Sequence, residues 1–210
     1  AGYTGLSAAL TLARAGRSVA VFDAEAPGWG ASSRNGGMLG PSLQRLDTDA
    51  LRLKYGEPQA HALLAESMEA LDYTMAFIDH EGIECDLVRV GRFRGAVTGA
   101  AFEAIAQEAE RLNRLVDLRA EIIPRNRQRS ELGTDFYRGG VVYHRDAGLN
   151  PAKYHAGLLT RACAAGATVL AKLAVTGVRH ESDGWRIATR LGVMSARDLL
   201  VATNAYTGKL

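Results

Sequence analysis

Residues 1–25 read AGYTGLSAALTLARAGRSVAVFDAE and carry the pattern from which the fold class is predicted. It begins with Gly2 and Gly5, which are separated by two residues. Apolar residues at three- to four-residue spacing follow and predict a helix over residues 7–15, with Gly16 placed to end it. Two glycines directly ahead of a helix are typical of a nucleotide-binding loop, and they also occur at an ordinary helix start.

The residues after this helix favour the nucleotide-binding interpretation. Residues 18–22 are largely apolar and end at Asp23, which predicts a short buried parallel strand. In a dinucleotide-binding unit the second glycine of G-x-G-x-x-G admits the pyrophosphate, the third lets the helix pack on the strand, and an acid about 20 residues on binds a ribose hydroxyl. Gly2 and Gly5 fit the second and third glycines, and Asp23 fits the acid. An acid at this position suits an unphosphorylated ribose, so NADP fits poorly.

A second glycine-rich loop separates a flavin from a nicotinamide cofactor. Residues 28–40 read GWGASSRNGGMLG. An NAD-binding unit has no need of such a loop after its acid, whereas an extended FAD passes along one, because small residues let the backbone approach its pyrophosphate, ribityl chain and ring. The sequence therefore predicts FAD, with an NAD-dependent dehydrogenase as the alternative.

Six segments in a fixed order carry a family resemblance across the whole chain. Together they resemble the FAD-dependent amine and amino-acid oxidoreductases of the D-amino-acid oxidase type, in the branch with gamma-glutamylputrescine oxidoreductase, glycine oxidase and sarcosine oxidase. The segments are GYTGLSAALTLARAG (2–16), VFDAE (21–25), GWGASSRNGGM (28–38), LNPAKYHAGLLTRACAAGATV (149–169), AVTGVRHESDGWRIAT (174–189) and LLVATNAYTG (199–208).

The resemblance implies an α/β fold of two domains. Residues 1–85 and 145–210 would form a discontinuous, Rossmann-like FAD-binding domain of the glutathione-reductase type. Residues 86–144 would form part of an inserted substrate domain with an antiparallel sheet. The first strand and first glycine would precede residue 1, and about half of the family's length would follow residue 210. The chain is therefore expected to be an N-terminal piece that binds FAD weakly or not at all by itself and turns over nothing.

The resemblance also implies a set of cofactor contacts. The pyrophosphate would be bordered by Gly2, Tyr3, Thr4 and Gly5 of the first loop and by Ala202 and Thr203 of the last segment. The adenosine would be contacted by Asp23 and Ala24 after the first strand, and its adenine also by Val175. The second loop would bring Ser32, Ser33 and Arg34 near the phosphates and place Gly37, Met38 and Leu39 along the isoalloxazine. The loop of residues 31–38 contains no histidine, so covalent attachment of the flavin from this loop is not expected.

The implied reaction is oxidation of a C–N bond in an amine or amino acid, with hydride transfer to flavin N5 and hydrolysis of the resulting imine. Gamma-glutamylputrescine, glycine, sarcosine and D-amino acids are the candidate substrates, with oxygen or another acceptor. No catalytic residue is assigned. Arg92 and Arg94 lie on a predicted strand of the substrate domain, alternate onto one face, and could bind a substrate carboxylate bidentately. A non-catalytic FAD- or nucleotide-binding module is the alternative from another functional class.

The composition excludes several other classes. The chain has 210 residues, 47% of them hydrophobic, and a net charge of +2 with interleaved signs, which does not favour nucleic-acid binding. No apolar run is long enough to cross a bilayer. Cys85 and Cys163 are far apart and outside any His/Cys cluster, so we expect reduced thiols, a cytoplasmic location and no metal site. There is no G-x-S-x-G motif, so a hydrolase is not expected. The oligomeric state is not predicted.

The remaining pattern predicts alternating helices and strands. Helices are expected over residues 57–81, 100–116 and 150–165, the last capped by Asn150 with Pro151 at its first position and ended by Gly166. Residues 125–129 are the densest basic run and are read as a solvated helix face. Strands are expected over residues 87–97, 135–144 with a break at Gly139 and Gly140, 168–171, 175–180, 185–190 and 197–202.

Overall fold

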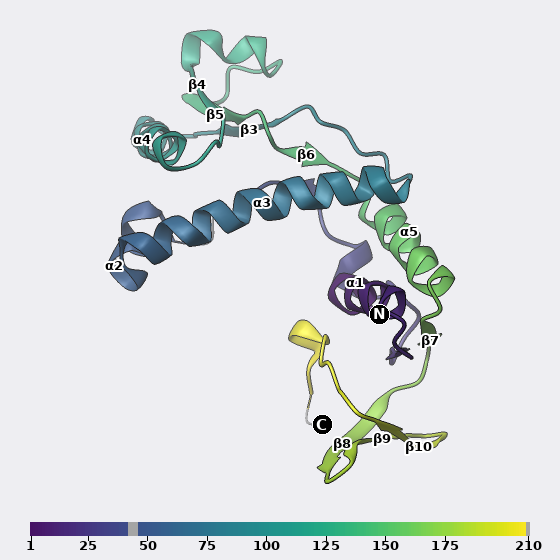
Figure 1. Cartoon of the computed structure of the whole chain (residues 1–210). Coiled ribbons are helices and arrows are strands. Elements are labelled where there is room, and N and C mark those ends of the chain that lie inside the picture. Colours follow the sequence, from purple (N-terminus) through teal and green to yellow (C-terminus); the bar gives the residue numbers. More distant parts are fainter. Residues whose placement is uncertain (42–45, 209–210) are drawn as a thin grey trace. The chain divides into compact units, whose positions relative to one another are not determined.

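A computed structural model of the chain describes residues 1–41 and 46–208, and Figure 1 colours it along the sequence from the N-terminus to the C-terminus. The chain divides into two compact units. Unit 1 consists of Ala1–Gly36, Glu81–Cys85 and Asn150–Leu210, and unit 2 of Gly37–His80 and Asp86–Leu149.

The units differ from the expected domains in one long segment. Residues 37–80 pack with residues 86–149 in unit 2, whereas the sequence groups them with the FAD-binding part. The physical reason is a shared apolar core between the long helix of this segment and the sheet and helix that follow it. This packing does not test which residues bind the cofactor and which bind the substrate. The FAD-binding domain predicted for residues 1–85 and 145–210 and the substrate domain predicted for residues 86–144 therefore stay predictions.

Unit 1 is built on a parallel strand pair with helices packed beside it. Strand β1 pairs with β7 in parallel, with Ala20 opposite Thr168 and Phe22 opposite Leu170. The helices bury Leu6 and Leu158, both at 0% exposure. The elements are α1 (Tyr3–Arg14), β1 (Ala20–Phe22), η1 (Ala31–Ser33), α5 (Pro151–Ala164) and β7 (Thr168–Leu170).

The predicted helix ends of unit 1 are confirmed. Gly16 follows α1 with φ +75° and Gly166 follows α5 with φ +101°, in the left-handed region that favours glycine. Asn150 caps α5: its side-chain oxygen accepts hydrogen bonds from the backbone N–H groups of Ala152 and Lys153, and Pro151 takes the first helical position.

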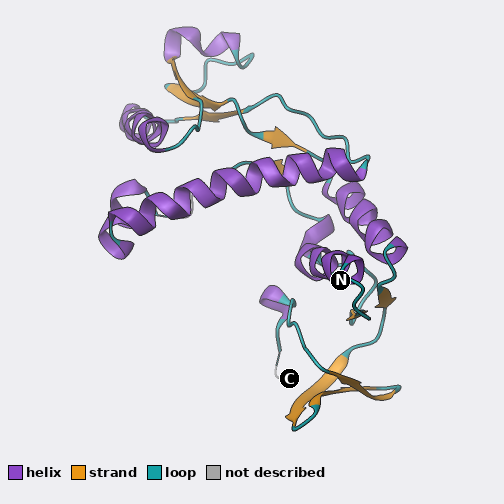
Figure 2. Ribbon diagram, in the orientation of Figure 1, coloured by secondary structure: helices purple, strands orange, loops and turns teal. Residues whose placement is uncertain are grey.

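The last part of unit 1 is a three-stranded antiparallel sheet in the order β10-β9-β8, drawn as orange arrows in Figure 2. The sequence predicts β8 and β9 but misses β10. It also places a strand at residues 197–202, which is wrong, because this segment runs without regular structure and makes no ladder hydrogen bonds with any residue that the structure describes. The elements are β8 (Val175–Glu181), β9 (Gly184–Thr189), β10 (Gly192–Ala196) and η3 (Asn204–Tyr206).

Unit 2 packs three helices with a small antiparallel sheet in the order β3-β5-β4. A separate two-stranded ribbon joins β2 to β6, with Met38 opposite Gly148 and Leu39 opposite Ala147. The elements are β2 (Met38–Leu39), α2 (Thr48–Tyr55), α3 (Glu57–Glu81), β3 (Arg92–Gly95), α4 (Gly99–Leu115), β4 (Ala120–Pro124), η2 (Arg125–Ser130), β5 (Gly139–Tyr143) and β6 (Ala147–Gly148).

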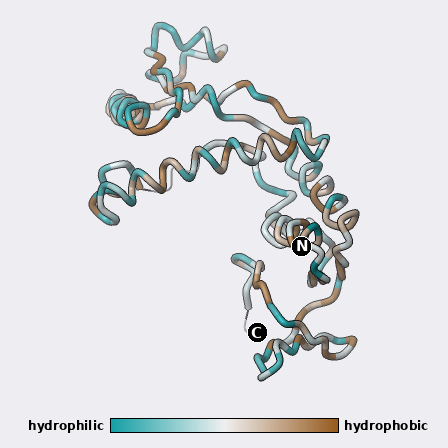
Figure 3. Tube along the Cα trace, viewed as in Figure 1, coloured by the Kyte–Doolittle hydropathy of each residue, from teal (hydrophilic) through white to brown (hydrophobic). Residues whose placement is uncertain are grey.

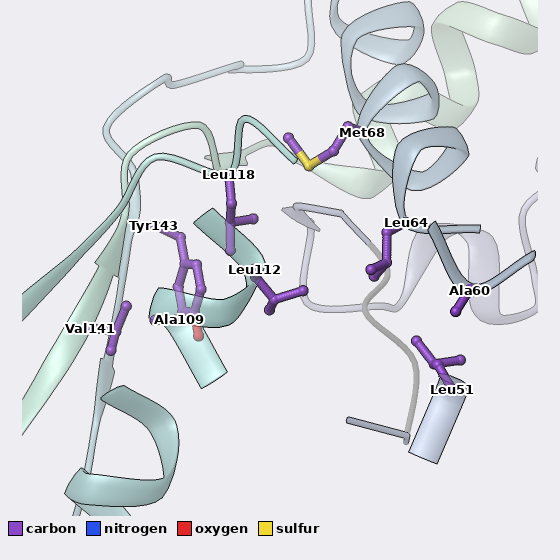
Figure 4. Close-up of a cluster of buried hydrophobic side chains, with 9 residues drawn as sticks. All are labelled: Leu51, Ala60, Leu64, Met68, Ala109, Leu112, Leu118, Val141 and Tyr143. Atoms are coloured by element: carbon purple, nitrogen blue, oxygen red, sulfur yellow. The ribbon is translucent and has the colours of Figure 1, made fainter. Parts of the chain in front are cut away.

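The core of unit 2 lies between its helices and one face of the sheet. Figure 3 shows apolar and polar residues alternating along α3, and the buried ones fall at three- to four-residue spacing, as predicted. Figure 4 shows the buried side chains that meet: Leu51, Ala60, Leu64, Met68, Ala109, Leu112, Leu118, Val141 and Tyr143.

Two strand predictions in unit 2 are corrected. The regular strand of the 87–97 stretch covers only Arg92–Gly95, preceded by an isolated bridge from Val88 to Gly148. Gly139 and Gly140 do not break a strand but begin one, because a Cβ on Gly140 would lie 2.4 Å from the ring of Phe93, so this close approach of β3 and β5 needs a residue without a side chain. The basic run 125–129 forms the short helix η2, with its arginines exposed as expected.

Two features are absent from the described residues. None of the helices combines the length and the apolar character that a bilayer span requires. No group of three or more His, Cys, Asp or Glu side chains there is arranged to hold a metal ion.

Candidate functional site

The N-terminus of α1 is the first component of the site. Gly2 is its N-cap residue in an extended conformation, with no side chain to cap the helix. The backbone N–H of Tyr3 donates to Oγ of Ser32 at 3.2 Å. The N–H groups of Thr4 and Gly5 lie in the first turn, where a helix offers no internal acceptors. These free donors and the positive end of the helix dipole suit an anionic group such as a phosphate.

The first loop and the second loop are in close contact at Gly2. A Cβ at this position would lie 3.0 Å from Oγ of Ser32, so the approach of the two loops depends on the missing side chain. Gly5 differs, because a Cβ there would lie 3.7 Å from Cβ of Ala202, an ordinary van der Waals contact. The close packing of helix on strand that is expected at Gly5, the third glycine of the motif, is therefore absent among the described residues.

Two residues join these loops to helix α5. His155 is 3% exposed, and its Nε2 lies 2.7 Å from the carbonyl oxygen of Ala1. Its ring also lies against Gly28, where a Cβ would come within 2.8 Å of Nδ1 and where φ is +80°. Tyr3 donates from its hydroxyl to the carbonyl of Pro151 at 3.1 Å, and burial raises the pKa of this phenol, while the Asn35 amide acts in the opposite direction. The role of His155 is not predictable from the sequence, because nothing in its local spacing connects it to residues 1 and 28.

Asp23 lies at the end of β1, where the sequence places it. Its Oδ1 accepts a hydrogen bond from the backbone N–H of Glu25 at 2.9 Å. The backbone of Asp23 is fixed by hydrogen bonds with Leu170 and Leu173. The carboxylate is therefore held at the carboxyl end of a parallel strand, where nucleotide ligands bind in folds of this class.

A cavity of about 1070 Å³ in unit 1 brings these elements together. Its volume is slightly above the usual range of ligand pockets. Most of the cofactor residues predicted for this unit line it: Gly2, Tyr3, Thr4, Gly5, Asp23, Ala24, Ser32, Val175, Ala202 and Thr203.

Two predicted phosphate neighbours lie away from this lining. The hydroxyl of Ser33 donates to the carbonyl of Gly28 and closes the second loop on itself. The guanidinium carbon of Arg34 lies 5.2 Å from the ring centre of Trp29, in a cation–π arrangement. In this structure both side chains shape the loop, and their approach to a phosphate stays a prediction.

The remaining predicted residues belong to unit 2. Gly37 is buried and accepts from the N–H of Leu149 at 2.8 Å. Met38 and Leu39 form strand β2 of the ribbon, and Met38 is 72% exposed. An exposed methionine on an ordered strand offers an apolar surface to a ligand.

Arg92 and Arg94 alternate onto the same face of the β3-β5 ladder, as expected, opposite Tyr143 and Val141. Their surroundings differ. Nε of Arg92 donates to Oδ2 of Asp146 at 2.7 Å, whereas Arg94 is exposed.

Comparison with known proteins identifies the family. The family model described as FAD dependent oxidoreductase (DAO) matches residues 1–210. The chain belongs to this family of FAD-dependent oxidoreductases.

Relatives of known sequence and structure agree with the family. Gamma-glutamylputrescine oxidoreductase of Escherichia coli strain K12 is 32% identical over 207 residues, which is 99% of this chain and 48% of the relative. Glycine oxidase from Geobacillus kaustophilus superposes with a TM-score of 0.74 at 23% identity, over 93% of this chain and 51% of that one. Iminodiacetate oxidase from Chelativorans sp. BNC1 gives 0.73 at 20% identity, over 93% and 51%. The chain thus spans about half the length of the curated relatives it matches, and the structures confirm the D-amino-acid-oxidase type of α/β fold.

The geometry of unit 1 fits the cofactor of this family. A pyrophosphate needs backbone N–H donors and a surface free of side chains, and the N-terminus of α1 with Gly2 provides both. A ribose needs an acceptor at the end of the adjacent strand, and Asp23 provides it. The family and the fold therefore support FAD as the cofactor, while each individual residue contact stays a prediction.

Proposed function

We propose that the full-length protein is an FAD-dependent enzyme that oxidises the C–N bond of an amine or amino acid carrying a carboxylate. The observation that carries the proposal is the cavity of unit 1, which gathers the helix N-terminus, Gly2 and Asp23 in a chain matched end to end by the FAD-dependent family. In the proposal, Gly2, Tyr3, Thr4 and Gly5 bind the pyrophosphate and Asp23 the ribose. Gly37, Met38 and Leu39 contact the isoalloxazine.

The names of the relatives support the substrate class. Gamma-glutamylputrescine, glycine and iminodiacetate are the compounds named for three of them. Each combines an oxidisable nitrogen with a carboxylate. An amine that bears a carboxylate is therefore the class that we propose for this protein, and one arginine of strand β3, either Arg92 or Arg94, is the candidate carboxylate ligand.

The chemistry divides between cofactor and protein. FAD, when bound, would supply the two-electron acceptor for the hydride that leaves the carbon next to the substrate nitrogen. The nitrogen loses a proton to solvent, and water then hydrolyses the imine to a carbonyl compound and ammonia or an amine. The residues of this chain bind the cofactor and orient the substrate; no side chain is required as a base when the neutral amine reacts.

The test uses the full-length protein purified with FAD. We expect flavin absorption in the visible region after removal of free FAD, and reduction of an electron acceptor or release of peroxide with a member of this panel: gamma-glutamylputrescine, putrescine, glycine, sarcosine and D-amino acids. Bound flavin with no turnover of any member would favour a non-catalytic FAD-binding protein. Absence of bound flavin would contradict the proposal altogether.

A further inference from the structure

Unit 2 contains a buried carboxylate in the turn between β5 and β6. Asp146 is 1% exposed, and its Oδ2 accepts a hydrogen bond from Nε of Arg92 at 2.7 Å. Its Oδ1 is buried and has no hydrogen-bond partner among the residues that the structure describes. Burying a carboxylate costs free energy even when it is paired, so stability alone does not explain an aspartate at this buried position.

The backbone fixes the position of this carboxylate. The N–H of Asp146 donates to the carbonyl of Tyr143 at 3.2 Å, and the carbonyl of Asp146 accepts from the N–H of Gly91 at 3.0 Å. Gly91 has φ +74°, which favours glycine there. Asp146 is thus held from both sides in the turn between β5 and β6.

The carboxylate lies against the ribbon that carries the proposed ring contacts. A Cβ on Gly40 would lie 2.6 Å from Oδ2 of Asp146, so residue 40 leaves room for the carboxylate only because it is glycine. Gly40 directly follows Met38 and Leu39 of β2, and β6 begins one residue after Asp146. The ion pair is therefore next to β2 within the same unit.

Asp146 and Tyr143 together constrain Arg92. The guanidinium carbon lies 4.9 Å from the ring centre of Tyr143, which faces Arg92 across the strand pair. Nε is used by Asp146, while neither Nη makes a hydrogen bond to any residue in the described ranges. The Arg92 side chain is 39% exposed. A planar guanidinium fixed in this way keeps an open edge of N–H donors, the geometry that binds a carboxylate bidentately.

We propose that Arg92 binds the carboxylate of the substrate and that Asp146 is the positioning residue that orients it. The proposal rests on the proposed function, and it separates the two arginines that the sequence leaves equal. Arg94 lies on the same face but is exposed, and no described residue bonds its guanidinium. It therefore serves as the matched control.

The electrostatics of the pair agree with this coupling. Burial raises the pKa of the Asp146 carboxyl, and the hydrogen bond and charge of Arg92 act in the opposite direction. The charged form of Asp146 thus depends on Arg92, and the orientation of Arg92 depends on that charge. Asn at position 146 keeps the shape and an acceptor oxygen but removes the charge.

The test measures carboxylate binding in the FAD-loaded full-length protein without turnover. Acetate and its neutral analogue acetamide are titrated separately, by calorimetry and by the change in flavin absorption. We expect the wild type to prefer acetate by about tenfold or more, as a charge-assisted bidentate pair allows. Arg92→Met should abolish the preference, Asp146→Asn should reduce it by about fivefold to tenfold, and Arg94→Met should leave it unchanged.

Kinetics provide the readout that a purely structural role would not change. Asp146→Asn should raise KM for glycine by about tenfold while it leaves KM for methylamine, which lacks the carboxylate, nearly the same. Should this variant fail to fold, Arg92→Lys replaces it: lysine can still pair with Asp146 but has no planar fork, so the acetate preference should fall at an unchanged thermal midpoint.

Several outcomes would overturn the proposal. They are a wild type that binds acetate no better than acetamide, an Arg92→Met or Arg92→Lys protein that keeps the preference, a folded Asp146→Asn protein that keeps it in full, and an Arg94→Met protein that loses it equally. Failure of the proposed function is distinguishable, because it would show as no oxidation of any amine while calorimetry still reports whether Arg92 selects acetate.

Discussion

Residues 1–36 of unit 1 and the β2–β6 region of unit 2 acquire their candidate sites in different ways. In the first region the spacing of Gly2, Gly5 and Asp23 along the chain already places a helix N-terminus and a carboxylate at one cavity. In the second region the important contact joins residues 92 and 146, which are 54 positions apart. Local sequence patterns therefore predict the first site and are silent about the second.

The difference also concerns what each region can tolerate. The first loop depends on the absence of a side chain at Gly2, since a Cβ there meets Ser32. The β2–β6 region of unit 2 depends on the ion pair between Arg92 and Asp146 and on the apolar core that packs against the sheet of this unit. Substitutions in the two regions should consequently separate cofactor affinity from stability.

The largest effect is expected in the core of unit 2. Leu112→Ala removes a side chain that is 3% exposed, and it should lower the free energy of unfolding by about 3 kcal/mol. Chemical denaturation of the full-length protein measures this loss. FAD affinity, measured on the folded variant, should stay within about twofold of wild type; a loss of affinity as large as that of a first-loop variant would contradict the separation of the two regions.

Gly2→Val should lower FAD affinity and should have little effect on the core of unit 2. The branched side chain would collide with Ser32 and cover the N-terminus of α1, so FAD affinity should fall by about 100-fold, corresponding to about 2.7 kcal/mol. Titration of the apoprotein with FAD, followed by quenching of flavin fluorescence, measures it.

Gly16→Ala at the other end of the same helix is the control for this variant. Its φ of +75° makes alanine strained, but there is open space around it, so stability should drop by about 1 kcal/mol with FAD affinity unchanged. Equal affinity of the Gly2→Val and Gly16→Ala proteins would show that the first loop does not contact the cofactor.

His155→Gln should have an intermediate effect. His155 connects α5 to Ala1 and to Gly28, so its loss should loosen both loops and weaken FAD binding by about fivefold to tenfold. His144→Gln, an exposed site in unit 2, should change nothing in the same titration. Unchanged affinity in the His155→Gln protein would assign this residue to packing alone.

The smallest effect is a pH dependence centred on Asp146. Its pKa is raised in the folded state by burial, against the opposing effect of Arg92, so the folded protein holds the proton more tightly than the unfolded chain. The stabilising contribution is then complete below the ordinary carboxyl pKa of about 4 and is lost as pH rises through the raised value. Asp146→Asn should therefore become more stable relative to wild type as pH rises through this window, in denaturation curves recorded at several pH values. A relative change of the opposite sign would mean that pairing with Arg92 outweighs burial.

Much of the fold is predictable because its signals are local. The apolar spacing of residues 57–81 predicts α3 with its observed bounds, and Asn150, Pro151 and Gly166 predict both ends of α5. The strand expected at residues 197–202 is wrong for the complementary reason: an apolar run becomes a strand only beside a neighbour that completes its hydrogen bonds.

The candidate site is predictable only in part. Glycine spacing and a terminal acid identify the cavity of unit 1, since backbone approach and helix polarity are encoded over a few residues. His155 and Asp146 were missed because their roles arise from contacts with Ala1, Gly40 and Arg92, far away in sequence. No local pattern in the sequence distinguishes Arg92 from Arg94. The position of the Asp146 carboxylate distinguishes them, because it bonds Arg92.

Anaerobic titration of the FAD-loaded full-length protein is the sharpest test of amine oxidation by this protein, because it detects cofactor binding, substrate binding and electron transfer without depending on the final acceptor. We expect gamma-glutamylputrescine or glycine to bleach the oxidised-flavin absorption, and the Arg92→Met protein to require much more of the same compound for the same change. A bound flavin that stays oxidised with every carboxylate-bearing amine would contradict it.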